Sequence, residues 1–91
     1  MEQNNFPKMI IVHHTGGTDA NPLADTSHHT IAIIREAHKA RGFYDPVSKE
    51  SVGYHWFIDK KGNIAQGRPE CRNGAHTTGY NTKSIGICLA G

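Results

Sequence analysis

The segment Met9-Ile10-Ile11-Val12-His13-His14 decides the fold. Its first four residues are apolar and rich in β-branched side chains, a pattern typical of a strand that is covered on both faces of a sheet. The strand runs directly into two histidines. We therefore expect a buried strand that carries imidazole side chains at its C-terminal end.

A helix is predicted after the polar loop that follows this strand. Over residues 28–41, apolar side chains at Ile31, Ile34 and Ala37 recur at helical spacing. Gly42 comes next and suits the left-handed conformation that ends many helices. We expect this helix to cover one face of the sheet.

Three further strands are predicted after the helix. Residues 54–59 and 64–68 flank a turn at 60–63, which predicts an antiparallel hairpin. Residues 85–89 form an apolar run that is typical of a buried central strand. This order of elements predicts an α/β fold, a mixed central β-sheet with at least one covering helix, in a single domain over residues 1–91.

Charge and hydropathy argue against two classes of partner. Ten Lys and Arg residues against eight Asp and Glu residues give a net charge of +2. The basic residues are scattered along the chain, so a nucleic-acid partner is not expected. No apolar run is long enough to span a membrane and no signal peptide is visible, so we expect a protein that is cytoplasmic as synthesised and has no membrane partner.

Seven histidines raise the question of a metal site. Catalytic zinc needs three protein ligands and structural zinc needs four, and the spacing of these histidines supports no such set. His13 and His14 project to opposite faces of a continuing strand, so at most one of them points into a given site. His76 in a glycine-bounded loop and Tyr54 in a strand are candidate functional residues, but the same positions suit an exposed histidine and a packing tyrosine.

Four segments, taken in their order and spacing, match a known pattern. They resemble the type-2 N-acetylmuramoyl-L-alanine amidases, the family of bacteriophage lysozyme-amidases and peptidoglycan recognition proteins. The resemblance covers nearly the whole chain, from about residue 9 to residue 91. The segments are Ile11-Val12-His13-His14-Thr15, Val52-Gly53-Tyr54-His55-Trp56-Phe57-Ile58, Gly74-Ala75-His76 with Gly79-Tyr80-Asn81, and Ser84-Ile85-Gly86-Ile87-Cys88-Leu89-Ala90-Gly91.

The resemblance implies a zinc-dependent hydrolase of the phage or prophage endolysin type, which acts on the cell wall after release. Such an enzyme cuts the amide bond between N-acetylmuramic acid and L-alanine, with zinc held by two histidines and one cysteine. His13 matches the first zinc ligand, whereas His14 occupies the neighbouring non-ligand position. Tyr54 matches the catalytic tyrosine, whose hydroxyl assists the zinc-bound water or stabilises the developing oxyanion.

The same resemblance implies that the protein contacts peptidoglycan or a soluble muropeptide. His76 matches a residue of the cleft that contacts the substrate, and Tyr80 with Asn81 would shape the same rim. His55 directly follows the catalytic tyrosine in sequence. Because side chains alternate along a strand, His55 is expected to point away from Tyr54 and to have a structural role.

The chain departs from the family pattern at the remaining zinc ligands. In the family, the second histidine and the cysteine follow the strand that ends near Gly91, and neither Cys71 nor Cys88 matches the ligand position. The resemblance therefore implies an amidase-like domain that is incomplete at its C-terminus and lacks the C-terminal helices that cover the second face of the sheet.

Two expectations follow from these missing ligands. The chain alone should bind zinc weakly and be inactive, because one histidine cannot fill a three-ligand site, and a completing chain or a second copy is a candidate partner. The alternative to an enzyme is a non-catalytic module that binds a muropeptide or a protein and derives from the amidase fold.

Overall fold

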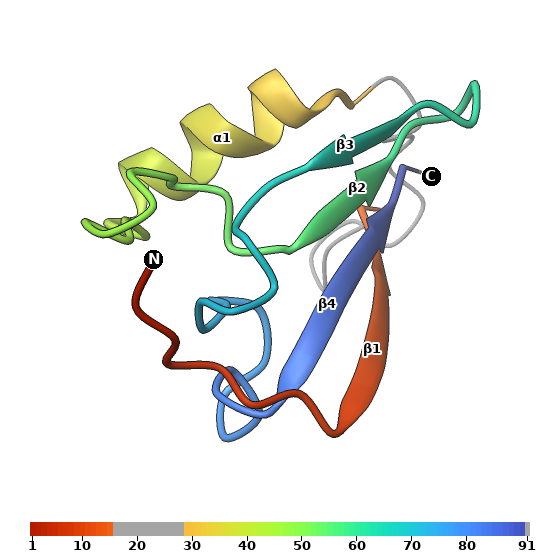
Figure 1. Ribbon diagram of the computed structural model, residues 1–91. Helices are drawn as coiled ribbons and strands as arrows, with labels where there is room; N and C mark the ends of the chain where they lie inside the picture. Colours follow the sequence, from red (N-terminus) through yellow and green to blue (C-terminus); the bar gives the residue numbers. More distant parts are fainter. Residues whose placement is uncertain (16–28, 91) are drawn as a thin grey trace.

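The computed structural model describes residues 1–15 and 29–90. Strand β4 lies between β1 and β2 and runs parallel to both, and β3 pairs antiparallel with the outer edge of β2 (Figure 1). This mixed sheet with one helix confirms the predicted α/β fold class. The elements are β1 (Met9–His14), α1 (Ile31–Ala40), β2 (Trp56–Ile58), β3 (Ile64–Gln66) and β4 (Ser84–Leu89).

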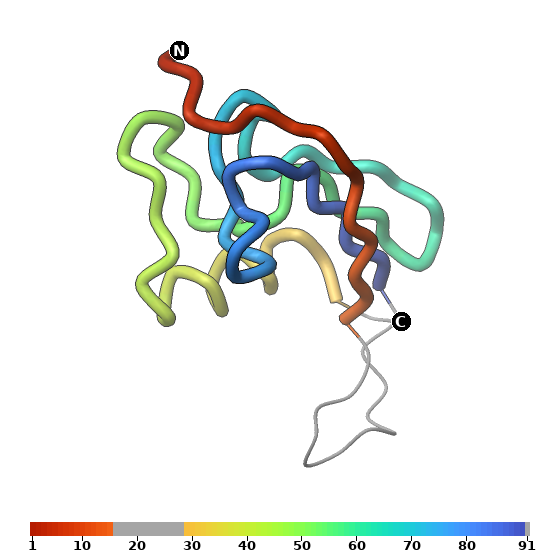
Figure 2. Tube along the Cα trace, turned by 90° about the horizontal axis from the view of Figure 1, so that it is seen from below, coloured from red at the N-terminus to blue at the C-terminus, as the bar shows by residue number. Residues whose placement is uncertain are grey.

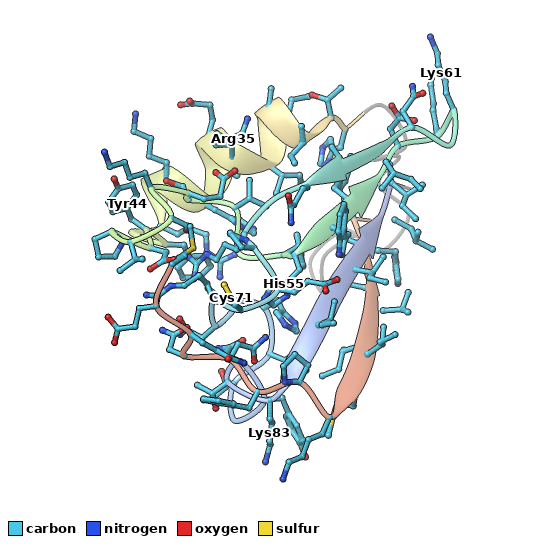
Figure 3. The ribbon with its side chains drawn as sticks, viewed as in Figure 1. Arg35, Tyr44, His55, Lys61, Cys71 and Lys83 are labelled. Atoms are coloured by element: carbon cyan, nitrogen blue, oxygen red, sulfur yellow. The ribbon has the colours of Figure 1, made fainter. Side chains whose placement is uncertain are left out.

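Strand β1 is an edge strand with one exposed face, so the predicted cover on both faces is wrong for the described residues. Ile11 and His13 face inward and are half-buried, whereas Ile10 and Val12 remain 63% and 62% exposed. No described helix or strand lies on that outer side of the sheet, and Figure 3 shows side chains of β1 and β4 projecting freely there. An apolar run therefore predicted the strand correctly but not its covering layer.

Helix α1 is shorter than the predicted range of residues 28–41, of which residue 28 lies outside the described part. It begins after Thr30, whose side-chain oxygen accepts a hydrogen bond from the Ile33 N–H, and it ends before Gly42, which has φ +81°. Ile34 packs against the sheet as predicted, in a buried cluster with Phe57 and Cys88. No helix in the described part of the chain has the length and apolar character needed to cross a membrane.

The predicted hairpin is present, but its first strand starts late. The backbone bends at residues 54 and 55, so β2 begins at Trp56 rather than at Tyr54. The bend breaks the period-two alternation, and Tyr54 packs against the buried cluster that contains Phe57. The predicted alternation is therefore wrong at this point, because it places Tyr54 and Phe57 on opposite sides.

The N-terminal segment straps the long loop at residues 70–83 onto the rest of the molecule (Figure 2). The N–H groups of Asn4 and Asn5 both donate to the Cys71 carbonyl, at 2.9 and 3.0 Å. The Asn5 side-chain amide is buried and donates to the carbonyls of Glu70 and Ser84, at 2.9 Å each. These hydrogen bonds join both ends of the loop to the N-terminal segment.

A buried ion pair holds the start of the same loop. The Arg72 guanidinium donates two hydrogen bonds to the Asp45 carboxylate, at 2.9 and 2.8 Å, and a third to the Glu2 carbonyl at 2.8 Å. Arg72 and Asp45 are both buried. Removal of one partner would leave an uncompensated charge in the interior, so this pair constrains where the loop can lie.

Asp45→Asn should destabilise the protein most strongly at neutral pH. The hydrogen bond from Arg72 holds the pKa of Asp45 well below its usual range. The carboxylate therefore stabilises the folded state above an unfolded-state pKa of about 3.9, and this stabilisation is lost as the pH falls toward the depressed pKa of the folded state. The difference in unfolding free energy between wild type and Asp45→Asn should shrink below about pH 4.

Urea denaturation at a series of pH values measures this difference. Glu36→Gln, at an exposed position on α1, is the control and should leave the pH dependence of stability close to that of wild type. A difference between wild type and Asp45→Asn that stays constant into the acid range would contradict the role given to the ion pair.

Candidate active site

Three of the residues implied by the family resemblance lie together on the covered side of the sheet. His13 comes from the C-terminal end of β1, Tyr54 from the bend before β2, and His76 from the long loop. The His13 ring centroid lies 5.3 Å from that of Tyr54 and 5.0 Å from that of His76, and the Tyr54 and His76 centroids are 6.3 Å apart. These three residues are far apart in the sequence. They come together because β4 runs parallel to both β1 and β2.

The nitrogens of His13 and His76 face each other directly. His13 Nε2 lies 2.9 Å from His76 Nδ1, and the Thr77 hydroxyl lies 3.1 Å from each of these two atoms. Burial, with a smaller effect of the neighbouring charges, lowers the pKa of His13 and lowers that of His76 to about 4. Both imidazoles are therefore neutral near pH 7, and Thr77 is a site residue that sequence analysis missed.

The His76 ring packs against two glycine residues, and a residue with a Cβ atom at either position would collide with it. A Cβ atom at Gly86 on β4 would lie 2.7 Å from the ring, and one at Gly74 would also collide with it. The Asn81 side-chain oxygen accepts hydrogen bonds from the backbone N–H groups of His76 and Thr77, at 2.9 Å each. The ring is thereby placed by its own loop and by β4 together.

The other described histidines near the site are occupied by backbone groups. His55 Nδ1 accepts from the Gly86 N–H at 3.0 Å, and His55 Nε2 donates to the Arg72 carbonyl at 2.7 Å. His38 Nδ1 accepts from the Gly53 N–H at 2.8 Å. Both rings are buried, and Figure 3 shows His55 in the interior. These contacts support the structural role that sequence analysis assigned to His55, and they give His38 a structural role as well.

His14 lies on the opposite face of β1 from His13. Its side chain is exposed, whereas that of His13 is half-buried in the cluster with Tyr54 and His76. The two neighbours thus project to opposite faces, as the strand geometry predicts. Of the two, only His13 points toward the other candidate site residues.

A cavity of about 280 Å³ opens beside Tyr54 and His76. At its wall the Arg41 guanidinium carbon lies 4.7 Å from the centre of the Phe43 ring, which places a cation where a carboxylate of a ligand could pair with it. Tyr80 is not part of the lining, and its ring instead contacts the Lys83 ammonium at 4.9 Å. The lining residues are His38, Arg41, Phe43, Tyr54, Ala75, His76, Thr77, Thr78 and Asn81.

Among residues 1–15 and 29–90, no group of three His, Cys, Asp or Glu side chains is placed to hold a metal ion. The His13 and His76 nitrogens offer two donors of the kind that zinc binds. Cys88 is fully buried, and burial raises the pKa of its thiol. A three-ligand zinc site would therefore need a ligand from outside the described residues.

Comparison with known proteins shows which family contains this chain. A family profile described as N-acetylmuramoyl-L-alanine amidase matches residues 3–91. The chain belongs to this family. The family resemblance predicted from the four sequence segments is thus confirmed.

Relatives of this amidase-family chain include phage and animal proteins. The endolysin of Escherichia phage T7 is 45% identical over 58 residues, which are 64% of this chain and 34% of the phage protein. Peptidoglycan-recognition protein SC2 of Drosophila melanogaster is 31% identical over 88 residues, which are 96% of this chain and 44% of the fly protein.

A solved structure extends the likeness to three dimensions. The N-acetylmuramoyl-L-alanine amidase LysC from Clostridium intestinale URNW matches with a TM-score of 0.73 and 36% identity, over 97% of this chain and 49% of LysC. The chain therefore spans between about a third and a half of the length of these relatives.

Asn81→Ala should loosen the His76 loop while leaving the sheet intact. The change removes the acceptor of two hydrogen bonds, each worth about 0.5–1.5 kcal/mol, so the unfolding free energy should fall by about 1–3 kcal/mol. The amides of His76 and Thr77 should exchange with solvent faster, which hydrogen exchange measured by NMR detects. Asn81→Asp keeps an acceptor oxygen and should retain most of the protection. Equal protection in wild type and Asn81→Ala would contradict this role of Asn81.

Proposed function

We propose that this chain supplies part of the active site of a zinc-dependent peptidoglycan amidase of the phage or prophage endolysin type. Its reaction would be hydrolysis of the amide bond between N-acetylmuramic acid and L-alanine. The observation that carries the proposal is the convergence of His13, Tyr54 and His76 beside one cavity, in a chain of the amidase family.

His13 is the proposed zinc ligand within this chain. Its Nε2 atom faces the cluster rather than solvent, and it is neutral near pH 7 because burial lowers its pKa. The other ligands in this proposal come from outside the described residues, from a continuing polypeptide, a completing chain or a second copy. When bound, zinc lowers the pKa of a coordinated water from about 15.7 to about 7 and polarises the scissile carbonyl.

Tyr54 is the proposed donor to the developing oxyanion. Burial raises the pKa of its phenol to about 12, so the hydroxyl keeps its proton near pH 7. A protonated phenol donates a hydrogen bond but accepts a proton poorly, which favours oxyanion stabilisation over general-base catalysis for this residue. Removal of one such donor typically slows turnover by about 100- to 1000-fold.

The cavity residues are proposed to orient the substrate. His76 and Asn81 line the cavity, and the Arg41 guanidinium beside them can pair with a carboxylate of the peptide stem. The Asn81 side-chain oxygen already accepts two hydrogen bonds from the loop backbone. Asn81 would therefore act on the substrate mainly by positioning His76. Tyr80, which does not line the cavity, would contact only a substrate that extends beyond it.

A second candidate function is recognition without hydrolysis. Peptidoglycan-recognition proteins are among the relatives, and the described residues lack a third metal-ligating side chain. A chain with this cavity could bind a muropeptide, or a protein, and leave the amide bond intact. The two functions make different predictions for hydrolysis, and the same predictions for binding.

Tyr54→Phe should slow amide hydrolysis by about 100- to 1000-fold and leave zinc bound, whereas His13→Ala should abolish both zinc binding and hydrolysis. The assay is the release of new amino termini from purified peptidoglycan, by the polypeptide that carries the remaining zinc ligands. Zinc content is measured in parallel on the same preparations.

His14→Ala is the matched control because the side chain of His14 is exposed on the other face of β1. An active, zinc-loaded His13→Ala protein would refute the ligand assignment and point to His14. Binding of a synthetic muramyl peptide with no release of amino termini, in a zinc-loaded wild-type protein, would favour the recognition function instead.

A further inference from the structure

A second cavity, of about 420 Å³, opens on a different face of α1 and shares no lining residue with the cavity beside Tyr54 and His76. Its volume falls within the range of about 300–1,000 Å³ that is typical of small-molecule sites. We propose that this cavity binds a phosphorylated sugar, with lysine ammonium groups on the phosphate and a tyrosine ring against the sugar. Its charged and aromatic lining residues are Arg35, Glu36, Lys39, Tyr44, Lys49 and Glu50.

An ion pair in the cavity wall neutralises Glu50 and leaves positive groups available. Arg35 Nε and Nη2 donate to the two Glu50 carboxylate oxygens, at 2.9 Å each. Among the residues that the structure describes, Arg35 Nη1 and the ammonium groups of Lys39 and Lys49 have no hydrogen-bond or ion-pair partner. A phosphate monoester carries about 1.5 to 2 negative charges near pH 7 and three acceptor oxygens, so it matches these three groups.

Lys49 has a backbone conformation that lysine rarely adopts. Its φ is +59°, and no other non-glycine residue in the described ranges 1–15 and 29–90 has a positive φ. The Lys49 N–H donates to the Asp45 carbonyl at 2.7 Å, and the Asp45 N–H donates to the Glu50 carbonyl at 3.0 Å, so the turn imposes this conformation. Glycine would adopt it without strain. Strained residues cluster at ligand sites, and a lysine at this place in the cavity wall points to a use for its ammonium group.

Two further side chains favour a sugar over a bare phosphate ion. Tyr44 lies in the loop after α1 and is 55% exposed, so its ring presents an uncovered apolar face at the cavity (Figure 3). The CH groups of a sugar ring can pack on such a face, whereas its hydroxyl groups need hydrogen-bond partners. The exposed Glu36 carboxylate is an acceptor for these hydroxyl groups. Because its charge repels phosphate, we expect the sugar rather than the phosphate beside Glu36.

The loop that carries Tyr44 and Lys49 is anchored in the interior before any ligand binds. The Asp45 carboxylate accepts from the Ser48 hydroxyl at 2.6 Å and is paired with the buried Arg72 guanidinium. A wall that is already ordered reduces the entropy that binding costs. The cavity therefore needs little rearrangement to receive a ligand.

NMR titration of the ¹⁵N-labelled 91-residue chain with N-acetylglucosamine 6-phosphate tests the proposal. The amide signals of residues 44–51 should shift, whereas those of His76 and Thr77 at the candidate active site should not. N-acetylglucosamine, which lacks the phosphate, and inorganic phosphate, which lacks the sugar, should each bind at least about fivefold more weakly.

Lys49→Gly separates binding from folding. The affinity should fall by about two- to fivefold, because the change removes an ammonium group from the phosphate. The melting temperature should stay close to that of wild type, because relief of the strained backbone offsets the greater freedom of glycine in the unfolded chain. Lys39→Gln should weaken binding by a similar factor. Lys61→Gln removes the same charge at an exposed position in the hairpin turn, and this control should bind as wild type does.

Five results would each overturn the proposal. They are equal affinity for the sugar with and without phosphate, equal affinity for inorganic phosphate, unchanged affinity in both Lys39→Gln and Lys49→Gly, an equal loss in Lys61→Gln, and no binding at tens of millimolar ligand. Lys49→Gly should retain any peptidoglycan hydrolysis by the polypeptide that carries the remaining zinc ligands, because Lys49 does not line the candidate active site. Failure of this proposal and failure of the amidase function are therefore distinguishable.

Cosedimentation with purified cell walls distinguishes a polymer-borne sugar phosphate from a free one. Sedimentation that falls after hydrofluoric acid has removed the phosphodiester-linked glycans, and that falls in the same way in Lys49→Gly, would assign the polymer. Binding of N-acetylglucosamine 6-phosphate without such sedimentation would assign the free compound.

Discussion

The His76 ring lies directly against the backbone of Gly86 in the centre of the sheet, and the candidate site depends on this contact. Without a Cβ atom at residue 86, the loop can place an imidazole at the level of His13 on the neighbouring strand. Because β4 is parallel to β1 on one side and β2 on the other, the same stretch of β4 borders both His13 and the bend that carries Tyr54. The contact between the His76 ring and the Gly86 backbone thus places the loop next to β1 and next to the bend before β2.

Buried polar groups, more than a large apolar core, hold the loop in this position. Among the described residues, only Ile34, Val52, Phe57 and Cys88 form the buried apolar cluster. Arg68 is also buried and donates to the carbonyls of Val52 and Asn73, at 3.0 Å each, so it links the segment before β2 to the loop that carries His76. Such groups are stable in the interior only when they are hydrogen-bonded, and this requirement specifies one arrangement of the loop.

Features that depend on residues close together in the sequence were predicted correctly, whereas a feature that depends on distant residues was not. The hairpin turn was predictable because turn residues act within a few positions, and Gly62 indeed adopts φ +85°. The Gly42 helix end was predictable for the same reason. The bend at residues 54 and 55 was not, because the His55 ring is held there by Gly86 and Arg72, which are distant in sequence. No period-two pattern contains that information.

By itself, the sequence determined the strands, the helix, the hairpin and the family, since these depend on side-chain periodicity, turn chemistry and the order of motifs. The tertiary structure alone decided that Tyr54 joins the covered side, that His13 and His76 place nitrogens 2.9 Å apart, and that Thr77 and Ser84 complete their surroundings. The physical reason is that these contacts join residues from different segments. Their geometry is set by the register of β4 and by the hydrogen bonds of the loop, which the spacing of residues along the chain does not encode.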